Sequence, residues 1–173
     1  MYNSVISGRK DGLYYACEGC MVILTSAKVL AKGTKVLDGT VISATFRDSR
    51  SGEYFADVQF AGCDFLKDVW LASSTFENCI FFKCSFSCDI VECKFINCKF
   101  VKCRFWSIEM TSIILESSKI IDSEFLTSTL MAITGGEIAD SLLHFCKLQE
   151  FETELRNCKL VCVSINGERS ISS

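Results

Sequence analysis

A five-residue period between Cys88 and Leu130 constrains this chain more than any other feature. Large apolar residues form one column with this spacing: Ile90, Phe95, Phe100, Phe105, Met110, Leu115, Ile120, Phe125 and Leu130. A second column, of mostly smaller residues, lies two positions before these: Cys88, Cys93, Cys98, Cys103, Ile108, Ile113, Ser118, Ser123 and Ser128. A period of five fits neither a flat strand nor a helix, whose side chains recur every two and 3.6 residues. The period therefore predicts a corner in the chain once in every five residues.

The alternation inside each five-residue unit is that of a short strand. The small residue points inward, the next outward, the large centre inward and the next outward, and the fifth residue turns the corner. A chain that turns in this way coils, and the two inward columns fill the coil. Backbone groups then pair with the coils above and below, which satisfies their hydrogen bonds.

This pattern resembles the pentapeptide-repeat proteins. Its clearest units are residues 93–97 (CKFIN), 98–102 (CKFVK) and 103–107 (CRFWS). The resemblance implies an all-β fold, a right-handed four-sided parallel β-helix with four units per turn and small capping segments. The resemblance names no function, because one fold serves many functions.

The frame predicts a column of core centres along the chain. Where the small column carries Ile108 and Ile113, the centres are Met110 and Leu115 in place of Phe, so that volume added in one column is removed from the other. Trp70 is expected to serve as a centre between Phe65 and Phe76. The core centres are predicted to be Phe60, Phe65, Phe76, Phe81, Phe86, Ile90, Phe95, Phe100, Phe105, Met110, Leu115, Ile120, Phe125 and Leu130.

The domain organisation follows from where the frame holds. Residues 1–35 are interpreted as an N-terminal cap, with a weak helical pattern at 26–32, and a partner-docking arm is the alternative. Residues 36–163 are the predicted β-helix, interrupted near 47–54 by a polar loop and near 131–137 around Gly135 and Gly136. Residues 164–173 form a polar C-terminal tail.

The twelve cysteines are interpreted as core residues and not as a disulfide framework. Most stand in the small inward column, where a free thiol behaves as a small buried hydrophobe in a reducing compartment. The predicted set is Cys63, Cys79, Cys84, Cys88, Cys93, Cys98, Cys103 and Cys146, with Cys158 as a ninth if Leu160 is a centre. Cys17 and Cys20 form a lone C-x-x-C. A zinc site would need further ligands, and the chain has one His, so no metal or cofactor is expected.

Composition limits the class of protein. The chain has 173 residues and a net charge of −3, which fits one domain. Proline is absent, which suits a ladder that needs every N–H. No apolar run is long enough to span a membrane, and the N-terminus does not resemble a secretory signal. The expected location is the cytoplasm, with delivery into a host cell as the alternative.

Four units per turn place the same face every 20 residues, which predicts an outer binding surface. One face points Phe82, Val101 and Ile121 outward, and the next points Trp106 and Leu126 outward. Beside them lie Lys83, Lys99, Lys102 and Lys119. Acidic residues (Asp57, Glu77, Asp89, Glu92, Glu109 and Glu116) are expected on the two opposite faces and absent from the lysine face. A contiguous apolar strip that contains Phe and Trp is typical of an interface.

The sequence favours a non-enzymatic protein–protein interaction module. It contains one His and neither a G-x-S-x-G motif nor a phosphate-binding glycine loop. One alternative is a DNA-mimicking, quinolone-resistance-type protein that binds DNA gyrase. Residues 51–130 carry 11 acidic and 7 basic side chains, which is sparse beside duplex DNA with one charge per ~1.7 Å. Another is the binding segment of a bacterial host-directed effector. The partner is predicted to be a protein or a second copy in a homodimer, and nucleic acid is disfavoured.

Overall fold

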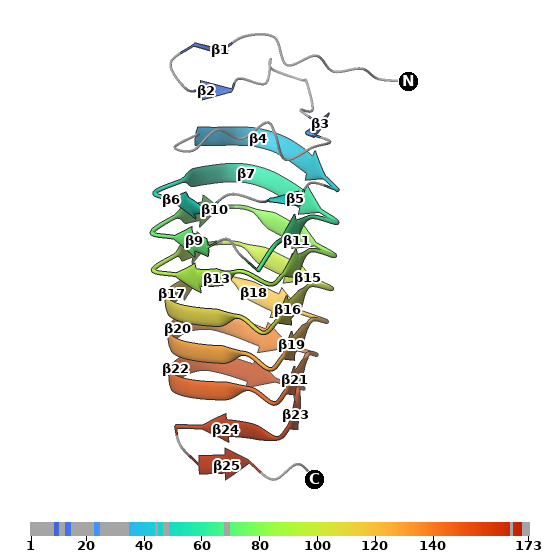
Figure 1. The fold of residues 1–173 in the computed structure, drawn as a ribbon, viewed down its shortest axis with the longest axis vertical. Helices are drawn as coiled ribbons and strands as arrows, with labels where there is room; N and C mark the ends of the chain where they lie inside the picture. Colours follow the sequence, from blue (N-terminus) through green and yellow to red (C-terminus); the bar gives the residue numbers. More distant parts are fainter. Residues whose placement is uncertain are drawn as a thin grey trace.

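The computed structural model describes residues 9–10, 13–14, 23–24, 35–43, 45–46, 49–67, 70–166 and 168–170. Within them the strands stack as successive coils of a column, from β4 (Lys35–Ile42) to β24 (Val163–Ile165) (Figure 1). The helical pattern at 26–32 and the cysteines Cys17 and Cys20 lie outside the described residues. Across those residues every element is a strand, which confirms the predicted all-β parallel β-helix.

The coil has four faces, and each strand pairs in parallel with the strand one coil away. Face 1 contains the first halves of β4 and β7 (Tyr54–Ala61), then β10 (Thr75–Glu77), β14 (Lys94–Ile96) and the end of β17 (Glu109–Glu116). Face 2 contains the second halves of β4 and β7, then β11 (Ile80–Phe82), β15 (Lys99–Val101), β18 (Lys119–Ile121) and the ends of β20 (Thr129–Ala139) and β22 (Lys147–Arg156).

Faces 3 and 4 complete each coil. Face 3 is a separate seven-stranded sheet of β5 (Thr45–Phe46), β8 (Asp64–Phe65), β12 (Ser85–Phe86), β16 (Arg104–Trp106), β19 (Glu124–Leu126), β21 (Leu142–His144) and β23 (Lys159–Val161). Face 4 contains β6 (Arg50–Ser51), β9 (Trp70–Ala72), β13 (Asp89–Val91), the starts of β17, β20 and β22, and β24.

The corners lie two residues after the centres, as the five-residue period predicts. Asn78, Lys83, Asn97 and Lys102 are examples, and the non-glycine corner residues have φ between 46° and 57°. This is the left-handed region, which L-residues enter as single residues at turns. At most corners the N–H donates to a carbonyl of the next coil, as from Lys83 N to Val101 O at 2.9 Å. The ladder therefore continues around the bend.

The small inward column has a hydrogen-bonding role as well as a steric one. Cys98 Sγ donates to the carbonyl oxygen of Phe76 at 3.3 Å, and Cys103 Sγ donates to that of Phe81 at 3.3 Å. In the next coil Ser118 Oγ donates to Phe95 O at 2.9 Å and accepts from Cys98 N at 2.9 Å. Cys and Ser interchange here because both are small and both can donate.

The centres fill the column with a stack of aromatic rings. The Phe81 and Phe100 rings are parallel with centroids 4.5 Å apart, and the Phe95 ring meets Phe100 edge-on at 5.2 Å. On face 3 the stack runs from Phe46 to Phe125. All fourteen predicted core centres are buried. Eight of the predicted cysteines are buried free thiols, and Cys158 is partly buried.

The expectation for Trp70 is wrong. Its side chain is 57% exposed, and Leu71 is buried in its place and pairs with Ile90. The extra residue therefore lies before Trp70, since Leu71 and Phe76 keep the five-residue spacing. Glu53, in the predicted interruption, occupies a small inward position and is buried, with its N–H donating to Ser74 Oγ at 3.1 Å.

The coil shortens at Gly135 and Gly136. Their φ values are 72° and 68°, and the pairing of β20 with β22 shifts between Thr134 and Glu137. A Cβ on Gly136 would lie 2.6 Å from Leu115 Cβ, so only glycine fits. A small apolar cavity lies nearby, with a lining of Met110, Leu115, Ile120, Phe125, Leu130, Ile133, Ile138 and Phe151.

The two ends of the column differ. At the lower end β25 (Glu168–Ser170) pairs antiparallel with β24, so the predicted polar tail contains a strand that closes the last coil. At the upper end β2 (Leu13–Tyr14) and β3 (Ile23–Leu24) pair with β4, and β1 (Arg9–Lys10) pairs antiparallel with β2. Both ends therefore have strand edges covered by further chain.

Candidate interaction surface

We call the set Phe82, Val101, Ile121, Trp106 and Leu126 the apolar strip. Strand register places its members in two columns. Phe82 stacks on Val101 and Val101 on Ile121 along face 2, while Trp106 stacks on Leu126 along face 3. Phe82 is 40% exposed and Trp106 62%, and the other three are half-buried. The predicted strip therefore points outward, and whether it binds anything remains a prediction.

The four lysines also lie where the frame predicts. Lys99 and Lys119 stack on each other, and Lys83 and Lys102 occupy successive corners of face 2. All four are exposed. The Lys83 ammonium lies 5.1 Å from the centroid of the Phe82 ring, where the negative face of the ring attracts a cation.

The expectation that acidic residues are absent from the lysine face is wrong. Lys102 Nζ lies 3.6 Å from Asp122 Oδ2, and Lys119 Nζ lies 2.7 Å from Glu137 Oε2. On face 3, Arg104 Nε lies 3.3 Å from Glu124 Oε2. The coil between Ile120 and Ile138 has 18 residues and not 20, which brings Glu137 under Lys119.

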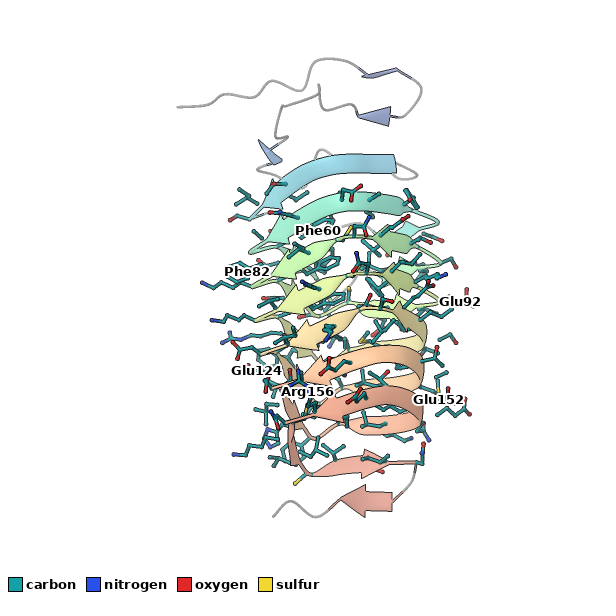
Figure 2. All side chains as sticks on the ribbon, turned by 180° about the vertical axis from the view of Figure 1, so that it is seen from behind. Phe60, Phe82, Glu92, Glu124, Glu152 and Arg156 are labelled. Carbon is teal, nitrogen blue, oxygen red and sulfur yellow. The ribbon has the colours of Figure 1, made fainter. Side chains whose placement is uncertain are left out.

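Glu137 is the best-paired acid of this surface. Its carboxylate contacts Lys119 on one side and Arg156 on the other. The hydrogen bonds from Lys119 and Arg156 hold the pKa of Glu137 below its ordinary value, because both favour the charged form. In Figure 2, Phe82 and Glu124 project from one side of the column and Glu92 and Glu152 from the other.

Faces 1 and 4 carry acids as expected, but in self-contained ladders. Asn78 Nδ2 donates to Asp57 Oδ1 at 3.1 Å, and Asn97 Nδ2 donates to Asn78 Oδ1 at 2.8 Å. Lys94 Nζ lies 2.8 Å from Glu116 Oε2. Neighbouring coils satisfy these polar groups. Each of these faces also exposes a large apolar side chain, Ile114 on face 1 and Trp70 on face 4.

Sequence reasoning missed further exposed apolar residues. Ile42 and Ile80 are each 37% exposed on face 2, where Ile42 lies two coils above Phe82 and Ile80 lies on the same strand as Phe82. Their signal was available, because both stand at positions next to a centre, which must point outward. Phe145 is 57% exposed and its ring stacks on His144 at 4.2 Å.

No group of three His, Cys, Asp or Glu side chains within the described ranges is arranged to hold a metal ion. A search of the same ranges finds no helix with the length and apolarity that membrane crossing requires.

Two observations characterise the fold. Four five-residue units make each regular coil, and a typical unit carries a small inward residue, a large inward centre and a left-handed corner. The fold is that of a pentapeptide-repeat β-helix. No family model matches the sequence, and no curated protein matches it.

Solved structures of pentapeptide-repeat type are similar to this one. Full-length QnrB1, a plasmid-mediated fluoroquinolone resistance protein, is 15% identical, with a TM-score of 0.33 over 82% of this chain and 92% of that one. HetL, a pentapeptide repeat protein involved in heterocyst differentiation regulation in the cyanobacterium Nostoc sp. strain PCC 7120, is 6% identical, with a TM-score of 0.20 over 86% of this chain and 92% of that one. At such identities the likeness carries no function, and the surface of this chain is the only guide to what it binds.

Proposed function

We propose that this β-helical protein is a non-enzymatic interaction module that binds a protein partner through the apolar strip. The observation that carries the proposal is the exposure of Phe82 and Trp106 beside half-buried Val101, Ile121 and Leu126 in two registered columns. Large aromatic side chains with fixed neighbours are the usual centres of binding energy at protein interfaces.

Rigidity supports the same function. The strip lies on parallel ladders whose strands pair on both sides, as β15 does with β11 and β18. A preformed surface loses little conformational freedom on binding, so more of the contact energy appears as affinity. Burial of each apolar side chain would contribute about 1.5–3 kcal/mol at most.

The DNA-mimic alternative is weaker on this geometry. A mimic of the duplex needs a continuous acidic surface. Here Lys83, Lys99 and Lys102 occupy one face, and the acids Glu116 and Glu124 are paired with basic side chains. DNA gyrase is therefore a partner to be tested separately and is not the partner that we propose.

The experiment compares wild type with the double variant Val101→Asp with Trp106→Asp as immobilised baits in extract from the native cell. The control is Ile96→Asp with Ile114→Asp, two outward residues of face 1. Proteins that bind wild type and the control but not the strip variant are identified by mass spectrometry, and purified gyrase is titrated separately.

We expect both variants to keep the far-ultraviolet circular dichroism of wild type. Equal capture by all three baits would contradict the proposal. Unfolding of the strip variant would show that its side chains belong to the core.

A further inference from the structure

We infer that face 2 is a self-complementary surface through which two copies of this chain associate side by side and antiparallel. The inference rests on the proposed function and names a second copy as the occupant of part of the strip. It follows from the order in which charges change sign along the column.

Face 2 has basic coils above Ile121 and mainly acidic coils below it. Register and corner hydrogen bonds fix the order: Phe82 lies over Val101, then Ile121, Ala139 and Arg156. The upper coils carry Lys83, Lys99 and Lys102, and the lower coils carry Glu137, Asp140 and Glu154. The middle coil carries one charge of each sign, Lys119 and Asp122.

A two-fold axis that crosses the column at the level of Ile121 places each upper coil opposite a lower coil of the second copy. Residue columns then face themselves in reverse order. Lys102 lies opposite Asp140 of the second copy, and Phe82 lies opposite its Arg156, a cation–π pair. Val101 lies opposite the coil of Ala139, whose own side chain is buried, and Ile121 meets its own equivalent on the axis.

The opposite arrangement is excluded by charge. With parallel columns, Lys83, Lys99 and Lys102 of each copy would meet at the same level, and like charges in contact repel. At the axis of the antiparallel pair the two Lys119 side chains approach each other, and so do the two Asp122 side chains. Each is already paired within its own chain, Lys119 with Glu137 at 2.7 Å and Asp122 with Lys102 at 3.6 Å. A partner of one sign would be repelled by one half of the face, whereas a second inverted copy fits both.

The size of the face sets the strength of the contact. The matched coils run from Phe82 to Arg156, about 20 Å at the ~4.8 Å spacing of strands. A contact face of this length buries an area at the small end of the range for specific protein interfaces. The expected dissociation constant of the dimer is therefore on the order of 10–100 µM. Trp106, on face 3, remains free for the partner of the proposed function.

Sedimentation velocity over about 5–500 µM protein tests the dimer, with salt as a second variable. Wild type should pass from monomer to dimer and dissociate more readily in high salt. Lys102→Asp and Asp140→Lys, each alone, should weaken association about tenfold or more, since each places like charges together. The double variant that carries both should return to within about threefold of wild type.

The control variant is Lys147→Asp, an exposed charge reversal on face 4 that should leave association unchanged. A protein that stays monomeric throughout, or a dimer that Lys102→Asp does not weaken, overturns the inference. If the double variant does not recover association, the inference is likewise overturned. Trp106→Asp separates the two proposals: it should reduce partner capture and leave the dimer intact.

Discussion

Replacing Phe100 with Ala probes the core at its most regular point. The side chain is 1% exposed, stacks on Phe81 at 4.5 Å and meets Phe95 edge-on at 5.2 Å. Removal of a buried Phe costs roughly 3–5 kcal/mol through lost transfer energy and the cavity that remains. Each lost ring pair adds about 0.5–1.5 kcal/mol beyond area burial. Because the coils above and below hold the backbone, little collapse can fill the space, and we expect the upper half of that range.

The assay is urea unfolding followed by circular dichroism, with the free energy of unfolding taken from the midpoint and slope. Phe82→Ala is the matched control: it lies one coil away on the same face, but it points outward and is 40% exposed. We expect a loss below about 1 kcal/mol for the control. A loss below about 1 kcal/mol for Phe100→Ala would refute the assignment of the inward column.

Three further predictions concern the thiols and the glycine bulge. Buried Cys93 should react with a thiol reagent only after unfolding, while exposed Cys162 should react in the native protein, and equal rates would contradict the packing. Burial raises the pKa of Cys93 from 9.0 to about 11, so the contribution of this thiol to stability is complete below pH 9 and falls as the pH rises toward about 11. The urea midpoint should therefore be lower at about pH 10 than at about pH 8. A midpoint that does not change with pH would contradict this. Gly136→Ala should destabilise the protein by about 2 kcal/mol or more, because the new Cβ would meet Leu115. Gly52→Ala, with open space around it, should cost about 1 kcal/mol. Equal urea midpoints for the two variants would count against the close approach of Gly136 to Leu115.

The sequence predicts the core well wherever the spacing is constant. From Cys88 to Leu130 every inward residue was assigned correctly, because a five-residue period allows only one frame. The Trp70 error arose where the spacing changed to six. Hydrophobicity alone does not choose between Trp70 and Leu71, and in the structure it is Leu71 that lies inside the coil and pairs with Ile90.

The surface is less predictable than the core because it depends on coil length. Outward positions follow from the frame, so the strip was found. Which charges meet depends on the number of residues in a turn. The step from Phe100 to Ile120 is 20 residues, but the step from Ile120 to Ile138 is 18. The pairing of Lys119 with Glu137 follows from that shortening, which a fixed period of 20 does not predict.

The pairing of each coil with its immediate neighbours alone has a consequence for how the column loses structure. Among the described strands, coils several layers apart share no backbone hydrogen bonds, so the column behaves as a one-dimensional chain of coupled units. End coils have one neighbour and middle coils have two. Amide hydrogen exchange should therefore be slowest in the coils of Phe81, Phe100 and Phe125 and faster toward β24 and β25. Loss of structure then proceeds from the ends inward, and the aromatic stack is the last part to open.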